Sequence, residues 1–400
     1  MSYLSQPSKC DNLLICRGLC SLGVLSAHIL TTNFNVIPDL RSTMSGSGVA
    51  LFSALARIWP TTGGNFVQVF FILSGYLMGK IFWEGRYTAQ RQDVLRFYRN
   101  RLLRIAPLLY FSLLILICFG GRFYQALGNP LALLGDLFFV NNLTGIAINS
   151  VTWSLSYEMQ YYLVCPFVFY ALAKATTRST TLALASAAAL FGVSLLHTAI
   201  GRTLILVPFD FAWLFVGGYS INLAVRLLHE GLGLTKNRLA TVMGYLLFAF
   251  AHGVYYALYN GSWSEAVRPF ANHLASLALF ACVYVSFVLF ELPRAPGSSR
   301  HQPGPVSMAF TWAGRISYGV YLWHLPLVAS ITGGEEFPLV SRKILGLLSV
   351  IGDRPVEHLL FALFWLVVCL ALTAVLSVTT FFLVEAGFRP NLYAVGKARM

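Results

Sequence analysis

The 400-residue sequence contains few charged residues. Asp, Glu, Lys and Arg together make up 11% of it, whereas hydrophobic residues make up 57%. This excludes an ordinary soluble enzyme, in which about a quarter of the residues are charged. The basic residues are not interleaved with solvated aromatic side chains, so nothing indicates nucleic-acid binding. No nucleic-acid partner is expected.

Motifs for metal binding and redox chemistry are also missing. The seven cysteines fall mostly within or beside apolar segments, without the CxxC pairing of a zinc or redox site. They are interpreted as small apolar residues in helices, and neither a disulfide nor a bound metal is expected. The sequence has no internal repeat, no heptad pattern and no separate soluble domain. Residues 1–400 are therefore predicted to form a single membrane domain.

Long apolar segments dominate what is present. A helix needs roughly 20 apolar residues to cross a bilayer, and about ten segments of the chain meet this requirement. The sequence therefore predicts an all-α, polytopic membrane protein. The predicted spans are residues 13–32, 66–83, 104–120, 153–174, 180–200, 203–226, 240–259, 270–290, 310–332 and 359–384.

The distribution of the 28 Lys and Arg residues predicts the orientation of the spans. Basic residues favour cytoplasmic loops, and most of them fall on the cytoplasmic side when the N-terminus is placed there. An even number of spans then places both termini in the cytoplasm, and the same bias accounts for the net charge of +13. The first apolar segment is expected to remain as a helix, because Arg17 interrupts it where a signal peptide is uninterrupted.

The first predicted span contains two ionisable residues, Arg17 and His28. Their spacing corresponds to about three helical turns and a rise of about 16 Å, so both lie on one helix face. Arg17 is expected near the cytoplasmic surface and His28 deeper, toward the outer leaflet. Ionisable residues within a span usually face a polar cavity. The alternative is that Arg17 reaches lipid headgroups and His28 hydrogen-bonds a neighbouring helix.

A carboxylate is expected at a similar depth. Glu158 lies in the stretch TWSLSYEMQYYLVCP, residues 152–166, which starts beside Trp153 at an outer membrane boundary and runs inward. A carboxylate at that depth can orient a histidine and raise its basicity for general-base catalysis. The alternative is a carboxylate that hydrogen-bonds a tyrosine and serves packing alone.

Three further groups have chemical potential. Arg101 and Arg104 share a helix face before the third predicted span, where they could bind a phosphorylated cytoplasmic ligand or only anchor the helix. Gly75, in FFILSGYLM, favours close helix packing. Tyr321 and His324 are expected at mid or outer depth, and a lone histidine in a tyrosine-rich helix is more often a satisfied core residue than a catalyst.

The chain resembles the membrane acyltransferase-3 family over nearly its whole length. The resemblance rests on five stretches in the family's order: RGLCSLGVLSAH, FFILSGYLM, FYRNRLLRIAP, TWSLSYEMQYYLVCP and ISYGVYLWHLPL. Arg17 and His28 match its most diagnostic element, Arg-x10-His, and Arg101 and Arg104 match its basic motif before the third helix. The family's last helix usually closes with Glu followed shortly by Pro. This chain keeps Glu385 but displaces the proline.

The resemblance implies an O-acyltransferase of a bacterial inner membrane. Its donor would be a cytoplasmic acyl-CoA, most often acetyl-CoA, which is a co-substrate rather than a permanently bound cofactor. Its acceptor would be a hydroxyl group of a surface or lipid-linked saccharide, such as the O-antigen of lipopolysaccharide or an exopolysaccharide. Such a protein would work in contact with the lipid bilayer.

The resemblance also implies roles for individual residues. His28 would remove the proton of the acceptor hydroxyl group, and Glu158 would orient His28. The residues assigned to donor binding are Arg17, Arg101, Arg104, Ser74 and Tyr76. The residues assigned to the acceptor or to support are Trp153, Tyr161, Tyr321 and His324.

Two other functions remain open. In a transporter or flippase, the intramembrane Arg, His and Glu would form a substrate or proton pathway. Transporters often have repeat-related halves, and the sequence shows no such symmetry. An acyltransferase acting on a small hydroxylated metabolite would share the mechanism and differ only in its acceptor. For acyl transfer, the candidate bases are His28, Glu158 and His324.

Overall fold

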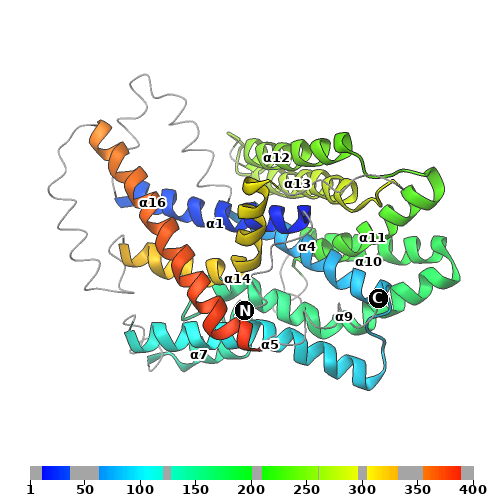
Figure 1. Cartoon of the computed structure of the whole chain (residues 1–400), viewed down its shortest axis with the longest axis horizontal. Coiled ribbons are helices and arrows are strands. Elements are labelled where there is room, and N and C mark those ends of the chain that lie inside the picture. Colours follow the sequence, from blue (N-terminus) through cyan, green and yellow to red (C-terminus); the bar gives the residue numbers. More distant parts are fainter. Residues whose placement is uncertain are drawn as a thin grey trace. The chain divides into compact units, whose positions relative to one another are not determined.

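A computed structural model of the chain describes residues 11–36, 63–119, 128–200, 210–259, 261–295, 304–331 and 355–388. The protein is helical in this part of the chain (Figure 1), and every predicted span overlaps a long helix, although the described part of the span predicted for 203–226 is helical only from Ala212. The all-α prediction is therefore confirmed, while the predicted cytoplasmic placement of both termini concerns residues outside this range. The long helices are α1 (Asn12–Val36), α4 (Gly63–Trp83), α5 (Arg91–Phe119), α9 (Trp153–Arg178), α10 (Thr180–Ile200), α11 (Ala212–Leu232), α12 (Arg238–Tyr259), α13 (Arg268–Glu291), α14 (Pro305–Ile331) and α16 (Pro355–Thr380).

Short elements connect some of these helices. The segment before α9 contains α7 (Pro130–Leu137), α8 (Asn141–Thr144) and the 3-10 helix η3 (Ser150–Thr152). After α16 the chain continues as the π-helix η5 (Phe381–Glu385) and the short α17 (Ala386–Phe388). The segment from α7 to η3 matters for the site, because its side chains hold part of α14.

Six segments of the described helices are long and apolar enough to cross a membrane, and they lie in α1, α4, α5, α12, α13 and α16 with η5. Several of these helices present large apolar side chains at the surface. Phe270 is 69% exposed and Leu383 is 73% exposed. Exposed apolar surface of this kind suits contact with lipid tails rather than water. The chain is a multi-pass integral membrane protein.

The chain packs as two compact units, each assembled from three separate stretches. Unit 1 comprises Met1–Cys20, Gly64–Tyr98 and Tyr157–Gly314, and unit 2 comprises Ser21–Gly63, Arg99–Ser156 and Arg315–Met400. The division falls inside α1, α5, α9 and α14 and after the first residue of α4, so each of these helices contributes residues to both units. The expectation of a single domain stays a prediction.

Unit 1 has an aromatic core. Helices α12 and α13 lie side by side (Figure 1), and α11 packs on α10 and on α13. Phe71 of α4 contacts Phe215 of α11, with ring centroids 5.0 Å apart, and Phe215 stacks on Tyr161 of α9 at 3.8 Å. Aromatic pairs of this kind bury large apolar areas. They join α4, α9 and α11 within the unit.

Glycine allows α4 and α11 to approach closely. A Cβ atom at Gly75 would collide with the backbone carbonyl group of Phe215, and one at Gly218 would collide with the carbonyl group of Ile72. Small residues permit such contacts between membrane helices. The packing role predicted for Gly75 is confirmed.

Unit 2 has an apolar cluster that brings α1 and α14 together. Its buried members are Leu25, Ile29, Ile316, Val320, Val328, Cys369 and Phe381. His28 lies on α1 one position before Ile29, and His324 lies midway between Val320 and Val328 on α14. The apolar contact between α1 and α14 therefore places both histidines where these two helices meet.

The close contact of α4 and α11 predicts the effect of Gly75→Ala. The added methyl group meets backbone rather than a movable side chain, so we expect a loss of about 1–3 kcal/mol in the free energy of unfolding. Thermal unfolding in detergent measures it. The control is Gly64→Ala in the same helix, where a Cβ atom meets nothing within 4 Å. Equal melting temperatures for the two variants would contradict the prediction.

Candidate functional site

Two histidines face each other in unit 2. The imidazole rings of His28 and His324 have centroids 5.1 Å apart and are inclined at 46°. His324 is 1% exposed, whereas His28 is half-buried. Each residue was a candidate base on sequence grounds, but they were not expected together. The shared depth predicted for their spans was the only signal that pointed to this pair.

The surroundings of His324 determine which of its nitrogen atoms carries the proton. Nδ1 lies 2.6 Å from the carbonyl oxygen of Tyr321 and 3.2 Å from that of Val320. Carbonyl groups only accept hydrogen bonds, so Nδ1 is the donor and Nε2 of the neutral ring keeps its lone pair. Nε2 is buried and makes no hydrogen bond to any described residue. His324 is thus held with a basic nitrogen available.

Tyr321 is fixed in turn by the segment before α9. Its hydroxyl group donates to the carbonyl oxygen of Val151 and lies 2.6 Å from Oγ of Ser154. The amide group of Asn149 donates to the carbonyl oxygen of Leu322 over 3.1 Å. Tyr321 and Leu322, which lie within one turn of His324 on α14, are therefore bound to residues 149–154. Tyr321 was assigned a supporting role from sequence, and these contacts show what it touches.

A buried carboxylate organises this segment. Asp136, at 1% exposure, accepts hydrogen bonds from the backbone N–H groups of Ile148 and Asn149 at 2.8 and 3.2 Å. Its other oxygen atom accepts from the side chains of Asn141 and Thr152. Burial raises the pKa of Asp136 above its ordinary value, and these four hydrogen bonds act against that rise. The sequence offered no motif that singled out Asp136.

Glu158 has its partners in unit 1. Oγ of Ser74 donates to Oε1 of Glu158 over 2.8 Å, and the hydroxyl group of Tyr162 donates to the same atom. The tyrosine matches the packing alternative considered for this carboxylate. Ser74, assigned to donor binding from sequence, is a neighbour of Glu158. The role of Glu158 in orienting His28 stays a prediction.

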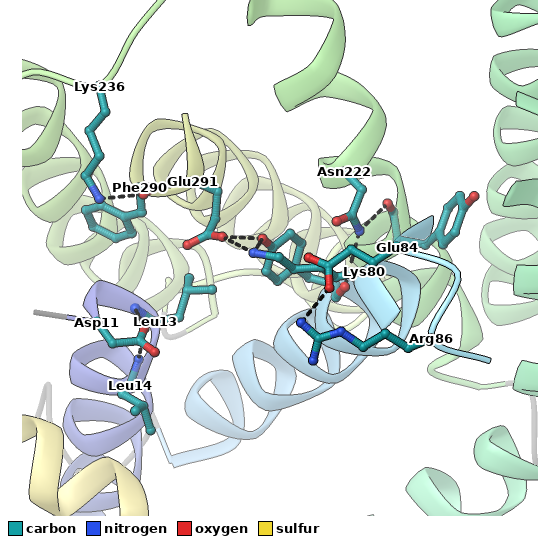
Figure 2. A network of polar contacts seen from close by, with 12 residues as sticks. Asp11, Leu13, Leu14, Lys80, Glu84, Arg86, Asn222, Lys236, Phe290 and Glu291 are labelled. Atoms are coloured by element: carbon teal, nitrogen blue, oxygen red, sulfur yellow. Dashed lines mark hydrogen bonds and ion pairs between the residues drawn. The ribbon is translucent and has the colours of Figure 1, made fainter. Parts of the chain in front are cut away.

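Tyr76 belongs to a charged cluster between α4 and α13 (Figure 2). Nζ of Lys80 lies 2.9 Å from Oε2 of Glu291 and 3.1 Å from the hydroxyl group of Tyr76, which itself donates to Glu291. Asp11 lies near this cluster and accepts hydrogen bonds from the backbone N–H groups that begin α1. Burial raises the pKa of Asp11, and those N–H groups act against the rise. The contacts of Tyr76 explain its place in the fold, and its assignment to donor binding stays a prediction.

The three predicted phosphate-binding arginines fall in both units. Arg17, in unit 1, has its guanidinium carbon 6.0 Å from the centroid of the Phe70 ring. Arg101 and Arg104 belong to unit 2, where Arg101 is buried at 6% exposure and Arg104 is half-buried. A buried guanidinium group is costly unless charge or hydrogen bonds compensate it. A common phosphate site stays a prediction.

The remaining acceptor candidates differ in exposure. Trp153, at the start of α9, is 37% exposed, and its predicted position at a membrane boundary stays a prediction. Tyr161 instead packs between Phe215 and Phe169. The contacts of Tyr161 in the structure are aromatic ones. The assignments of Trp153 and Tyr161 to the acceptor stay predictions.

A family model described as an acyltransferase domain matches residues 12–384. The chain belongs to the acyltransferase-3 family. The match includes both histidines, Glu158 and the three arginines, and it confirms the resemblance found in the motifs.

Several curated relatives of this acyltransferase-3 chain are O-acetyltransferases. O-acetyltransferase OatA of Staphylococcus aureus (strain NCTC 8325 / PS 47) is 28% identical over 135 aligned residues, covering 30% of this chain and 22% of the relative. Peptidoglycan O-acetyltransferase OatA of Listeria monocytogenes is 25% identical over 317 residues, covering 72% of this chain and 49% of the relative. The putative peptidoglycan O-acetyltransferase YrhL of Bacillus subtilis is 22% identical over 338 residues, covering 76% and 51%.

The chain spans about half the length, or less, of these curated relatives. No solved structure matches it.

The charged cluster predicts the effect of Glu291→Gln. Because Glu291 accepts from both Lys80 and Tyr76, its neutralisation should lower the free energy of unfolding by about 1 kcal/mol. Thermal unfolding of the purified protein measures this change. The matched control is Glu230→Gln on α11, since Glu230 pairs with Arg226 at 2.8 Å but its side chain is 61% exposed. A control as destabilised as Glu291→Gln would rule out a special contribution of the cluster.

Proposed function

We propose that the protein transfers an acyl group, most often acetyl, from a cytoplasmic acyl-CoA to a hydroxyl group of a surface or lipid-linked saccharide. Membership of the acyltransferase-3 family and the names of the O-acetyltransferase relatives support this reaction class. The observation that supports the mechanism is the contact between His28, which is half-buried, and the buried His324. A neutral imidazole can take a proton from a hydroxyl group, which is the task of a general base. The membrane concerned would be the inner membrane of a bacterium.

The proposed reaction starts at the hydroxyl group of the acceptor. His28 takes its proton while the oxygen atom attacks the thioester carbonyl carbon, and a C–O bond forms. The C–S bond then breaks, coenzyme A leaves as a thiolate, and the proton on His28 returns to it. The products are an O-acyl ester and free coenzyme A. No oxidant or metal ion is required for this balance.

The imidazole of His324 supports His28 as the base in this mechanism. The lone pair on Nε2 of His324 lies on the ring next to His28, so it can accept a hydrogen bond from a protonated neighbour. That interaction would stabilise the charge that His28 acquires. Glu158 keeps its proposed role as the carboxylate that orients the base, with Ser74 and Tyr162 holding one of its oxygen atoms.

Cationic groups are proposed to hold the donor. Coenzyme A carries phosphate groups, and arginine binds phosphate with directed, charge-assisted hydrogen bonds. Arg17, Arg101 and Arg104 are the proposed ligands, with Ser74 and Tyr76 on the donor side. Trp153, Tyr161 and Tyr321 are proposed to contact the acceptor or the developing oxyanion. Acyl-CoA therefore acts as a co-substrate.

The acceptor is proposed to be a saccharide because two of the relatives are named for peptidoglycan. A lipid-linked or polymeric glycan would reach the outer part of the membrane, where His28 is predicted to lie. A small hydroxylated metabolite remains the second candidate, with the same chemistry.

Purified protein in nanodiscs with radiolabelled acetyl-CoA tests the proposal. His28→Ala should reduce acetyl transfer to a crude glycolipid extract by about 100-fold or more, because a general base contributes that much, while binding of acetyl-CoA is retained. His273→Ala is the control, since His273 is exposed on α13. Full activity of His28→Ala would refute the role of His28.

Arg17→Ala tests the donor site in the same assay. Loss of a charge-assisted contact should raise the Kd for acetyl-CoA about tenfold or more, with a smaller effect on the rate at saturation. The control is Arg238→Ala at the start of α12. An unchanged Kd would remove Arg17 from the donor site. Peptidoglycan fragments and small hydroxylated metabolites, offered in place of the glycolipid extract, identify the acceptor class.

A further inference from the structure

Pro326 leaves a gap in the hydrogen-bond ladder of α14 close to His324. In an α-helix the carbonyl group of residue 322 accepts from the N–H group of residue 326, and proline has no N–H group. Leu322 and His324 are both buried, so water does not readily replace the missing donor. The carbonyl group of Leu322 therefore needs a donor from elsewhere.

Asn149 supplies that donor. Its Nδ2 atom lies 3.1 Å from the carbonyl oxygen of Leu322, and the residue is 2% exposed. The Oδ1 atom of the same amide accepts from the N–H group of Val151 and so caps η3. Both ends of the Asn149 amide are thus used, one within its own segment and one on α14.

The backbone at Asn149 is itself held in place. Its N–H group donates to Asp136, and its carbonyl oxygen accepts from the N–H group of Thr152. Asp136 also binds the side chains of Thr152 and Asn141. An amide anchored in this way cannot move far without breaking buried hydrogen bonds, each of which is expensive to lose.

We infer that Asn149 is a positioning residue for acyl transfer: its amide completes the α14 ladder that Pro326 interrupts and so fixes the imidazole of His324 against His28. The neighbouring contact acts in the same direction, because Val151 and Ser154 hold Tyr321, and the carbonyl group of Tyr321 holds Nδ1 of His324. All of these residues belong to unit 2. The inference rests on the proposed function, in which the histidine pair takes part in proton transfer.

The test uses Asn149→Ser in the full-length protein. Serine keeps an oxygen atom that can cap η3, but it is too short to reach Leu322. We expect the rate of acetyl transfer at saturating acetyl-CoA to fall about 10- to 100-fold, as when a catalytic group is displaced slightly, with the KM for acetyl-CoA unchanged. Asn129→Ser is the control, since Asn129 precedes α7 without a side-chain capping bond. It should keep the wild-type rate.

Rescue separates positioning from a general loss of structure. Pro326→Ala restores an N–H group that can donate to Leu322, so Asn149→Ser should cost little in that background. The activities of Pro326→Ala and of the double variant should then agree within about twofold, since the two changes act on one contact. A full additional loss in the double variant would overturn the inference, and so would equal rates for Asn149→Ser and wild type.

A second measurement does not depend on activity. Diethyl pyrocarbonate modifies accessible histidine side chains, and mass spectrometry reports the rate at His324, with the exposed His273 as reference. Asn149→Ser should raise the rate at His324 several-fold in the wild-type background and leave it unchanged in the Pro326→Ala background. An unchanged rate in both backgrounds would overturn the inference even if Pro326→Ala is inactive.

Failure of the proposed function gives a different result. If His28→Ala retains full transfer, the base assignment fails whatever Asn149→Ser does. If His28→Ala is inactive and Asn149→Ser behaves like Asn129→Ser in both measurements, the inference about Asn149 fails alone.

Discussion

The structure depends on one constraint, that a polar group withdrawn from water must find a partner inside the protein. Helices meet it for most of the backbone. The side chains that break the apolar pattern meet it locally: Glu158 through Ser74 and Tyr162, and Asp136 through four donors. Where proline removes a backbone donor in α14, Asn149 provides another. The residues singled out as functional are embedded in these pairings, so their chemistry and their support share the same hydrogen bonds.

The sequence predicted those features of the fold that depend on residues close together in the chain. Each span is a local apolar run, and every predicted span overlaps a helix of the structure. Gly75 could also be assigned to packing, because the absence of a side chain is itself a local property. The pairing of His28 with His324 joins residues far apart in the chain, and α1 and α14 meet through an apolar cluster that no motif records. The membrane depth of these residues stays a prediction, and no motif predicted which helices become neighbours.

The segment from α7 to η3 is a second case in which contacts between distant residues could not be predicted from sequence. It lies between two predicted spans, and its few polar residues, among them Asp136, Asn141 and Asn149, are of types that are common in turns. Their importance arises only when the loop folds back, since Asp136 then collects donors from residues 141–152 and Asn149 reaches α14. Polar side chains in a membrane protein loop are therefore ambiguous in sequence. Burial distinguishes those that organise the structure, and Asp136 and Asn149 are almost completely buried.

The need of a buried polar group for a partner also has a chemical consequence at the pair of His28 and His324. The carbonyl group of Tyr321 fixes the proton of His324 on Nδ1, which leaves Nε2 as an acceptor on a side chain that is almost completely buried. A protonated imidazole is costly in such surroundings unless a neighbour accepts its hydrogen bond. A base that holds a proton only briefly, between the attack on a thioester and the departure of the thiolate, avoids most of that cost. In the proposed mechanism His28 would be such a base, and Nε2 of His324 would accept the hydrogen bond of its transient charge.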